Sequence, residues 1–145
     1  MRKYLLAIAV VLACVSNVSA KQVDYSNRDL DCMARNIYFE ARGESDRGMI
    51  MVAEVTLNRL DHKKFPQTIC GVIYQKGAFQ WTTGKGRISD KEEYERAKSI
   101  AKSVLDGSAH LTGTEALFFK RKGSKSSFHD SRIYLGTTGN HSFYK

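Results

Sequence analysis

The sequence predicts an α+β domain that is mainly helical and ends in a small antiparallel sheet. Apolar residues recur at helical spacing in three segments before residue 107, and short strand-like stretches separated by turn residues follow. The chain has 145 residues and a single proline. This length fits one compact domain, and we expect a monomer.

The first 20 residues have the pattern of a secretory signal peptide. Arg2 and Lys3 precede an apolar run over residues 4–15, and small residues end at Ala20. Because the run is shorter than the roughly 20 residues that span a bilayer, we expect cleavage after Ala20. An alternative places a lipid on Cys14, as in lipoproteins. Either route predicts export to the periplasm, the cell wall or the extracellular space.

The exported part of the chain is basic. Loss of residues 1–20 removes two of the 23 Lys and Arg, which leaves 21 basic against 15 acidic side chains and a net charge of about +6. This excess indicates an anionic partner such as a wall or membrane-surface polymer, and export makes nucleic acid an unexpected one. We divide the remainder into a leader at 21–29, which includes the start of the first helix, and one domain at 30–145.

Two cysteines, Cys32 and Cys70, remain after the predicted cleavage. In an oxidising compartment such a pair is most simply a disulfide. Closing a loop between residues 38 positions apart would stabilise the fold by about 4 kcal/mol in the chain-entropy description. The alternative is a catalytic thiol, which would need a histidine partner.

The first helix is expected to begin at Ser26, with Asp29 in a capping box. Cys32 and Phe39 lie opposite its main apolar stripe, so this helix is expected to be sandwiched in the core. The stripe consists of Leu30, Met33, Ala34, Ile37, Tyr38 and Ala41.

A second helix is predicted from about Ser45 to Leu60, after a stop at Gly43. It is apolar nearly all round and is therefore expected in the core. Glu54, Asn58 and Arg59 form its polar side.

The remaining elements are shorter. Residues 65–75 fit a helical turn or a strand, and residues 77–89 form a Gly-rich loop. A third helix is predicted from Ser89, with Glu92 in a capping box, to Gly107. The expected strands are 115–120, 131–136 and 141–145, with a turn at 137–140.

Glu40 is the leading candidate for catalysis. It lies at the edge of the apolar stripe near the turn at Gly43, where desolvation raises a carboxyl pKa and keeps the proton available for a leaving oxygen. Glycoside cleavage uses such an acid, often with a second carboxylate, for which Glu44 is the nearest candidate. Alternatively, Glu40 pairs with Arg35 or Arg42, and Glu44 favours the positive N-terminus of the second helix.

Five stretches follow one another over nearly all of residues 30–145: LDCMARNIYFEARGES, GMIMVAEVTLNRL, FPQTICGVIYQ, FQWT and HSFYK. In this order they resemble the SleB-like family of bacterial cell wall hydrolases, named for the spore cortex-lytic enzymes. The resemblance implies a lysozyme-like or transglycosylase-like catalytic domain that acts on peptidoglycan glycan strands without a cofactor.

The resemblance also implies that Glu40, the first Glu of the EARGE motif, is the catalytic acid. It would protonate the oxygen between N-acetylmuramic acid and N-acetylglucosamine, and then accept the proton of the muramic C6 hydroxyl as an anhydro ring closes. One carboxylate suffices for this route, because the substrate's N-acetyl group can stabilise the developing cation.

Aromatic residues near the Gly-rich loop are candidates for contact with sugar rings. Phe79 and Trp81 would offer flat apolar faces, although both could instead fold into the core. Tyr74 and Gln75 are weaker candidates for the cleft. His141 resembles the histidine of the family's closing His-x-Phe-Tyr, and is expected either to shape the cleft from a strand or to be structural.

No metal site is expected, because the histidines lack the short spacings of zinc ligands. They are His62, His110, His129 and His141. The basic run at 120–125 is either a solvated face or a salt-sensitive attachment to anionic polymers.

The function predicted from these observations is peptidoglycan cleavage, by a lytic transglycosylase. Two alternatives stay open: an N-acetylmuramoyl-L-alanine amidase, and a noncatalytic basic wall-binding protein with the same fold.

Overall fold

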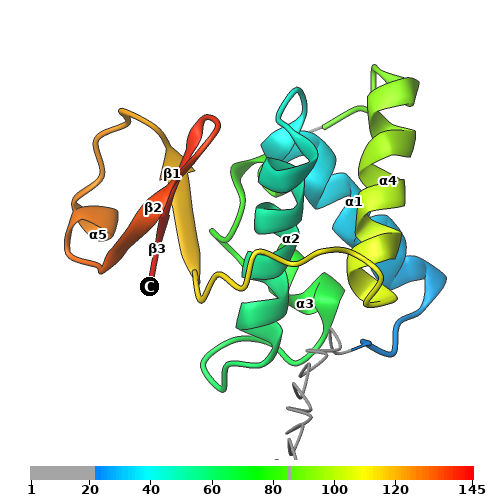
Figure 1. The fold of residues 1–145 in the computed structure, drawn as a ribbon, viewed down its shortest axis with the longest axis horizontal. Helices are drawn as coiled ribbons and strands as arrows, with labels where there is room; N and C mark the ends of the chain where they lie inside the picture. Colours follow the sequence, from blue (N-terminus) through cyan, green and yellow to red (C-terminus); the bar gives the residue numbers. More distant parts are fainter. Residues whose placement is uncertain (1–21, 85) are drawn as a thin grey trace, which may run out of the picture.

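The computed structural model describes residues 22–84 and 86–145. Helices α1 to α4 form one body, and a three-stranded sheet with the short helix α5 lies beside α2 (Figure 1). This arrangement confirms the α+β class. Within the described residues, no helix is both long enough and apolar enough to cross a membrane. The predicted signal peptide and Cys14 lie outside the described residues.

Helix α1 (Asn27–Ala41) is the centre of the helical body. Its start is as expected, since Ser26 and Asp29 form both hydrogen bonds of a capping box. The helix contacts α2, α3 and α4, and Met33, Ile37 and Tyr38 are fully buried. The expectation of a helix sandwiched in the core is confirmed.

Helix α2 (Asp46–Leu60) follows after a tight turn. Gly43 takes a backbone φ of +82°, a conformation that glycine adopts at little cost, and the Ser45 hydroxyl caps the helix by accepting from the Gly48 N–H. The predicted stop and start are both confirmed. Because these two elements meet in a short turn, the end of α1 and the start of α2 lie side by side (Figure 1).

The polar side of α2 is buried, and it binds the segment that leads from α4 to the sheet. Glu54 is only 4% exposed. Its carboxylate accepts hydrogen bonds from the Thr112 hydroxyl and from the Gly113 N–H, at 2.9 Å for the latter. A buried carboxylate is tolerated here because both of its oxygens are hydrogen-bonded.

Asn58 and Arg59 continue this attachment along α2. The Asn58 side-chain amide donates to the carbonyls of Thr114 at 2.7 Å and Ala116 at 3.0 Å, and Arg59 Nε donates to the Leu117 carbonyl at 2.7 Å. The backbone carbonyls of this extended segment thus bind side chains of α2 in place of the neighbouring strand that they would bind in a sheet. The start of the sheet is thereby fixed against the helical body.

The stretch at 65–75 forms helix α3 (Ile69–Tyr74), whose first turn is capped by Thr68 Oγ1, which accepts from the Gly71 N–H at 3.1 Å. The predicted disulfide between Cys32 and Cys70 is present and joins α3 to α1. Since both cysteines are oxidised together, the alternative of a catalytic thiol is excluded for this structure.

Helix α4 (Lys91–Leu105) begins slightly later than the sequence predicts. Its N-cap is Asp90, which accepts from the Glu93 N–H at 3.1 Å, so the expected capping box of Ser89 and Glu92 is wrong. The reason is tertiary. The buried Tyr38 hydroxyl accepts from the backbone N–H groups of both Ser89 and Asp90 and thereby fixes the entry to α4.

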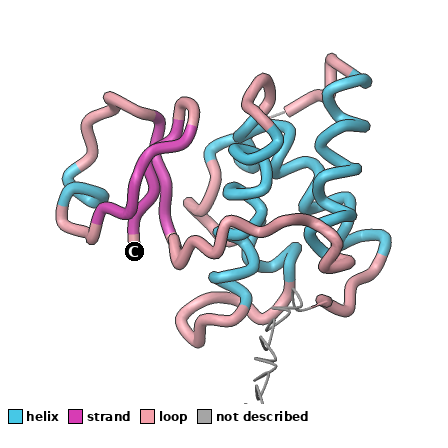
Figure 2. The backbone as a smooth tube through the Cα atoms, in the orientation of Figure 1, coloured by secondary structure: helices cyan, strands magenta, loops and turns pink. Residues whose placement is uncertain are grey.

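The sheet has the order β1-β3-β2 and is antiparallel throughout. Figure 2 shows its strands together on one side of the helical body. The strands are Phe118–Arg121, Tyr134–Thr138 and His141–Tyr144, and α5 (Ser127–Asp130) lies between the first two along the chain. β1 begins later than expected because α2 holds the residues before it. Phe143 of β3 is fully buried with Met51 and Val55 of α2, which joins the sheet to the helical body.

The disulfide gives a first test of this fold. We expect the variant Cys32→Ala/Cys70→Ala to lose about 2 to 5 kcal/mol of unfolding free energy, because the unfolded chain regains the freedom of the closed loop. Urea unfolding followed by circular dichroism measures this loss. Wild-type protein in excess reductant should shift in the same direction; equal stability with and without the bond would contradict the prediction.

Candidate active site

A cleft of about 640 Å³ separates the helical body from the sheet. The end of α1, the start and end of α2 and the loop at 78–80 form one side, and β1, the loop after it, α5 and the β2–β3 turn form the other. Glu40 and Glu44 both line this cleft. The two carboxylates that the sequence singled out therefore face the same space.

Glu40 lies in the last turn of α1 and is partly buried. Burial raises the pKa of its carboxyl to about 7, and the nearby positive charge of Arg59 opposes this shift without cancelling it. The carboxyl accepts no hydrogen bond from any residue that the structure describes. At neutral pH a large share of the molecules therefore carry a proton here, available to an oxygen in the cleft.

Arg59 comes from α2 and is 6% exposed. Burial lowers its pKa to about 10, so the guanidinium keeps its charge at neutral pH. The guanidinium carbon lies over the rings of Phe79 at 5.1 Å, Phe65 at 5.4 Å and Phe118 at 5.6 Å. Its Nη1 has no hydrogen-bond partner among the described residues. A buried cation thus lies close enough to Glu40 to influence its ionisation.

The expected alternative pairing of Glu40 with Arg35 or Arg42 is not observed. Arg35 binds Asp31, at 2.8 Å between Nε and Oδ2, and Arg42 donates to the Tyr38 hydroxyl at 2.8 Å. Since neither arginine forms an ion pair with Glu40, structural pairing does not explain the position of this acid.

Glu44 has a different environment, although it lines the same cleft. Both of its carboxylate oxygens accept from the Asn140 backbone N–H, at 3.1 and 3.3 Å. Gly139 packs against the same carboxylate: a Cβ there would lie 1.8 Å from Oε2, and the backbone φ of +55° also favours glycine. Glu44 therefore connects the turn before α2 to the β2–β3 turn on the opposite side of the cleft.

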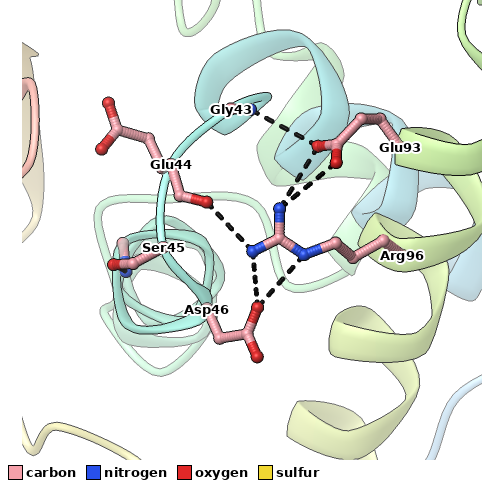
Figure 3. Close-up of polar contacts among 7 residues, drawn as sticks. Gly43, Glu44, Ser45, Asp46, Glu93 and Arg96 are labelled. Carbon is pink, nitrogen blue, oxygen red and sulfur yellow. Dashed lines mark hydrogen bonds and ion pairs between the residues drawn. The ribbon is translucent and has the colours of Figure 1, made fainter.

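The turn that carries Glu44 is held by Arg96 of α4 (Figure 3). Arg96 Nη2 donates to the Glu44 backbone carbonyl at 3.0 Å and to Asp46 at 2.6 Å, while Nη1 pairs with Glu93 at 3.3 Å. The Gly43 N–H also donates to Glu93, at 3.4 Å. Figure 3 shows the Glu44 carboxylate pointing away from Arg96, so the turn is fixed through its backbone and the carboxylate stays available to the hairpin.

His141, at the start of β3, lines the cleft and is 7% exposed. Burial lowers the pKa of its imidazole, and the charge of Glu44 opposes this shift. The ring is therefore neutral at pH 7, and its edge packs against Phe119 with centroids 5.1 Å apart. The structure places His141 where the sequence expected it, in a strand beside the cleft.

Of the two positions expected for Phe79, exposed beside a sugar or folded into the core, the structure shows the second. The residue is 4% exposed, lies under the Arg59 guanidinium and packs beside Phe119. Its edge lines the cleft, but its ring belongs to the core. The apolar surroundings of Arg59 account for this burial.

Trp81, in the short 3-10 helix η1 (Gln80–Thr83), is partly buried beside the end of α1. It stacks on Phe39 with centroids 4.7 Å apart and donates its N–H to the Asn36 side chain at 3.0 Å. Tyr74 is 50% exposed and meets Trp81 edge to face. Neither Trp81 nor Tyr74 is among the described residues that line the main cleft. Gln75 is exposed and lines an adjoining hollow of about 450 Å³.

No group of three histidine, cysteine, aspartate or glutamate side chains in residues 22–84 and 86–145 gathers as a metal site would require. Polar groups at the cleft include the Glu40 carboxyl, the buried Arg59 guanidinium and the backbone N–H that binds Glu44.

Comparison with known proteins identifies the family of this chain. The family described as cell wall hydrolase matches residues 43–144. The chain belongs to the cell wall hydrolase family. The spore cortex-lytic enzymes of Oceanobacillus iheyensis and Bacillus cereus are each 33% identical to this chain over 83% of its length. The match spans 43% and 46% of those proteins, so the chain spans less than half the length of these relatives.

Solved structures agree with this membership. The catalytic domain of the Bacillus cereus SleB protein matches with a TM-score of 0.67 and 32% identity, over 84% of this chain and 93% of that domain. The catalytic domain of the germination-specific lytic transglycosylase SleB from Bacillus anthracis gives 0.68 and 31%, over 83% and 97%. The chain therefore has the fold of these catalytic domains.

Sequence reasoning missed several residues that shape the cleft. Arg59 was read only as part of a polar helix side, although a lone arginine among apolar neighbours is a signal for a buried cation. The sequence predicts only a turn at Gly139 and Asn140. Glu44 contacts the backbone N–H of Asn140 and the space left by the missing Cβ of Gly139, so neither contact depends on a side chain of the turn. No sequence signal indicated that Arg96 would hold the Glu44 turn, because the two are 52 positions apart.

The raised pKa of Glu40 predicts a pH-dependent difference in stability. The folded protein binds this proton more tightly than the unfolded chain, so its stabilisation is complete below about pH 4.5 and is lost as pH rises through about 7. Glu40→Gln has no such titration. We expect its unfolding free energy, relative to wild type, to rise by about 2 to 3 kcal/mol between pH 4 and pH 8. Urea unfolding at several pH values measures this, and a pH-independent difference would contradict it.

Proposed function

We propose that this protein cleaves peptidoglycan glycan strands between N-acetylmuramic acid and N-acetylglucosamine, as a lytic transglycosylase with Glu40 as acid and base. The observation that carries the proposal is a partly buried carboxyl, with a pKa near 7, that faces a cleft wide enough for sugar rings. The names of the relatives support the substrate and the reaction class.

In the first step, protonated Glu40 gives its proton to the glycosidic oxygen as the bond from the muramic C1 to that oxygen breaks. The substrate's N-acetyl group stabilises the positive charge that develops at C1. In the second step, the muramic C6 oxygen bonds to C1 while its proton passes to the Glu40 carboxylate. The anhydro ring closes, and the acid is regenerated without a water molecule.

A pKa near 7 suits both halves of this cycle, because the group must release and recover a proton at similar cost. Burial favours the neutral acid before the first step. The Arg59 charge favours the carboxylate that exists between the two steps. Arg59 is thus proposed to limit how far burial raises the pKa.

Glu44 is proposed to position the cleft walls instead of acting as a second acid or nucleophile. Its two oxygens are already used by the Asn140 N–H, and it lies against Gly139. His141, the residue after Asn140, would then be held in place on the cleft wall. Contact with the substrate is also proposed for His141, Trp81, Tyr74 and Gln75. Phe79 is proposed to support Arg59, whose guanidinium lies over its ring.

The proposed site of action is outside the cytoplasmic membrane, in the periplasm or at the cell wall, as the predicted signal peptide indicates. Two other functions predict other products. An amidase would free peptide stems, and a noncatalytic wall-binding protein would release nothing.

Product analysis tests the reaction. Purified peptidoglycan treated with wild type should yield anhydromuramic ends by mass spectrometry. Glu40→Gln should lower their rate of release by at least about 100-fold, since it removes the proton donor. Reducing muramic ends would indicate hydrolysis and freed stems an amidase. No product from wild type would contradict both enzymatic functions.

Two variants of Glu44 test its role. Glu44→Gln keeps an oxygen that can accept from the Asn140 N–H, so it should retain most activity and the wild-type pH profile. Glu44→Ala removes that acceptor and should lower activity by about tenfold, a cost of about 1.4 kcal/mol that is typical of one hydrogen bond. If Glu44→Gln is as inactive as Glu40→Gln, a second carboxylate is required and the positioning role is wrong.

A further inference from the structure

The cleft carries more positive charge than the chemistry at Glu40 uses. Five basic side chains line it, against the two carboxylates of Glu40 and Glu44. The histidines of the lining do not add to this charge at neutral pH, because burial lowers the pKa of each imidazole. The five basic residues are Arg42, Arg59, Lys120, Arg121 and Lys125.

Three of these cations have no acidic partner among the residues that the structure describes: Arg42, Arg121 and Lys125. Lys120 differs, because it pairs with Asp130 at 2.8 Å. Outside the cleft some cations, such as Arg96 and Lys102, also form ion pairs. The cleft itself is lined by three cations that form none.

The unpaired cations lie on both sides of the catalytic acid. Arg42 follows the end of α1, two residues after Glu40. Arg121 ends β1, where it is paired in register with His141, and Lys125 lies in the loop that follows. Arg121 is close enough for its charge to lower the pKa of His141. Unpaired cations that line one cleft raise its positive potential, which attracts an anionic ligand.

The sugar rings of a glycan strand are uncharged, so they do not account for this potential. The carboxylates of peptidoglycan belong to the peptide stems attached to the muramic residues. Arginine matches a carboxylate with two parallel N–H donors, and lysine adds a mobile point charge. Ser124 and Ser126 line the same wall, where the Ser124 hydroxyl donates to the Arg121 carbonyl at 2.7 Å and the Ser126 hydroxyl lies 2.7 Å from His129 Nδ1.

We propose that Arg121 and Lys125, with Arg42 opposite, form an anion subsite that binds stem-peptide carboxylates next to the scissile bond. The proposal rests on the proposed function and deepens it: the preferred substrate is a glycan strand that still carries its carboxylate-bearing stems. This role differs from general attraction by the basic run at 120–125, because Lys122, in the same run, is not among the residues that line the cleft.

Binding measurements test the subsite independently of cleavage. Glycan strands purified free of phosphate polymers are compared before and after their carboxyl groups are converted to neutral methylamides. All proteins carry Glu40→Gln so that strands stay intact. We expect the untreated strands to bind about tenfold more tightly than the methylamide strands. This ratio of affinities should fall toward one when Arg121→Gln/Lys125→Gln is added, and it should also decrease with added salt.

The matched control is Lys122→Gln/Lys98→Gln, which removes the same charge from exposed positions outside the cleft. It should keep most of the tenfold ratio. Equal binding of both strand preparations, or an equal loss in the control, would overturn the subsite. An effect seen only with walls that retain phosphate polymers would assign the anion to phosphate and would also overturn it. If wild type releases no anhydromuramic product, the proposed function fails while the binding ratio still tests the subsite.

Discussion

The cleft depends on the attachment of residues 112–117 to the buried polar side of α2. Glu54, Asn58 and Arg59 together accept or donate five hydrogen bonds to this segment. These bonds satisfy backbone groups of the segment beside the helix and fix the residues that lead into β1. Together with the packing of Phe143 on Met51 and Val55, the three side chains position the sheet that forms the second cleft wall.

Arg59 links this attachment to the acid chemistry. Its Nε holds the Leu117 carbonyl, and its guanidinium lies within the electrostatic reach of Glu40. For Glu40 two effects compete: burial raises the pKa, and the arginine lowers it. Burial dominates, because the carboxyl gains no hydrogen bond in exchange for lost water, and the pKa settles near 7. Glu44 does gain such bonds, so two glutamates four residues apart have different environments.

Local sequence signals predicted much of the fold. The capping box at Ser26, the turn at Gly43 and the cysteine pair each depend on nearby residues or on simple pairing, and all are observed. The predicted start of α4 was too early, because the Tyr38 hydroxyl, 51 positions away from Ser89, binds the backbone just before the helix. The position of Glu40 in a partly buried edge followed from helical periodicity. The partners of the two glutamates did not, because long-range packing brings Arg59 near Glu40 and a backbone N–H joins Asn140 to Glu44.

The central claim is that folding places Glu40 where its carboxyl keeps a proton near neutral pH. The direct measurement is a titration of the Glu40 side-chain carboxyl carbon by NMR, with glutamate labelled at Cδ and the signal assigned by its absence from Glu40→Gln. The account predicts a midpoint near pH 7 in the folded protein. A midpoint near 4.5, the ordinary value for glutamate, would contradict it.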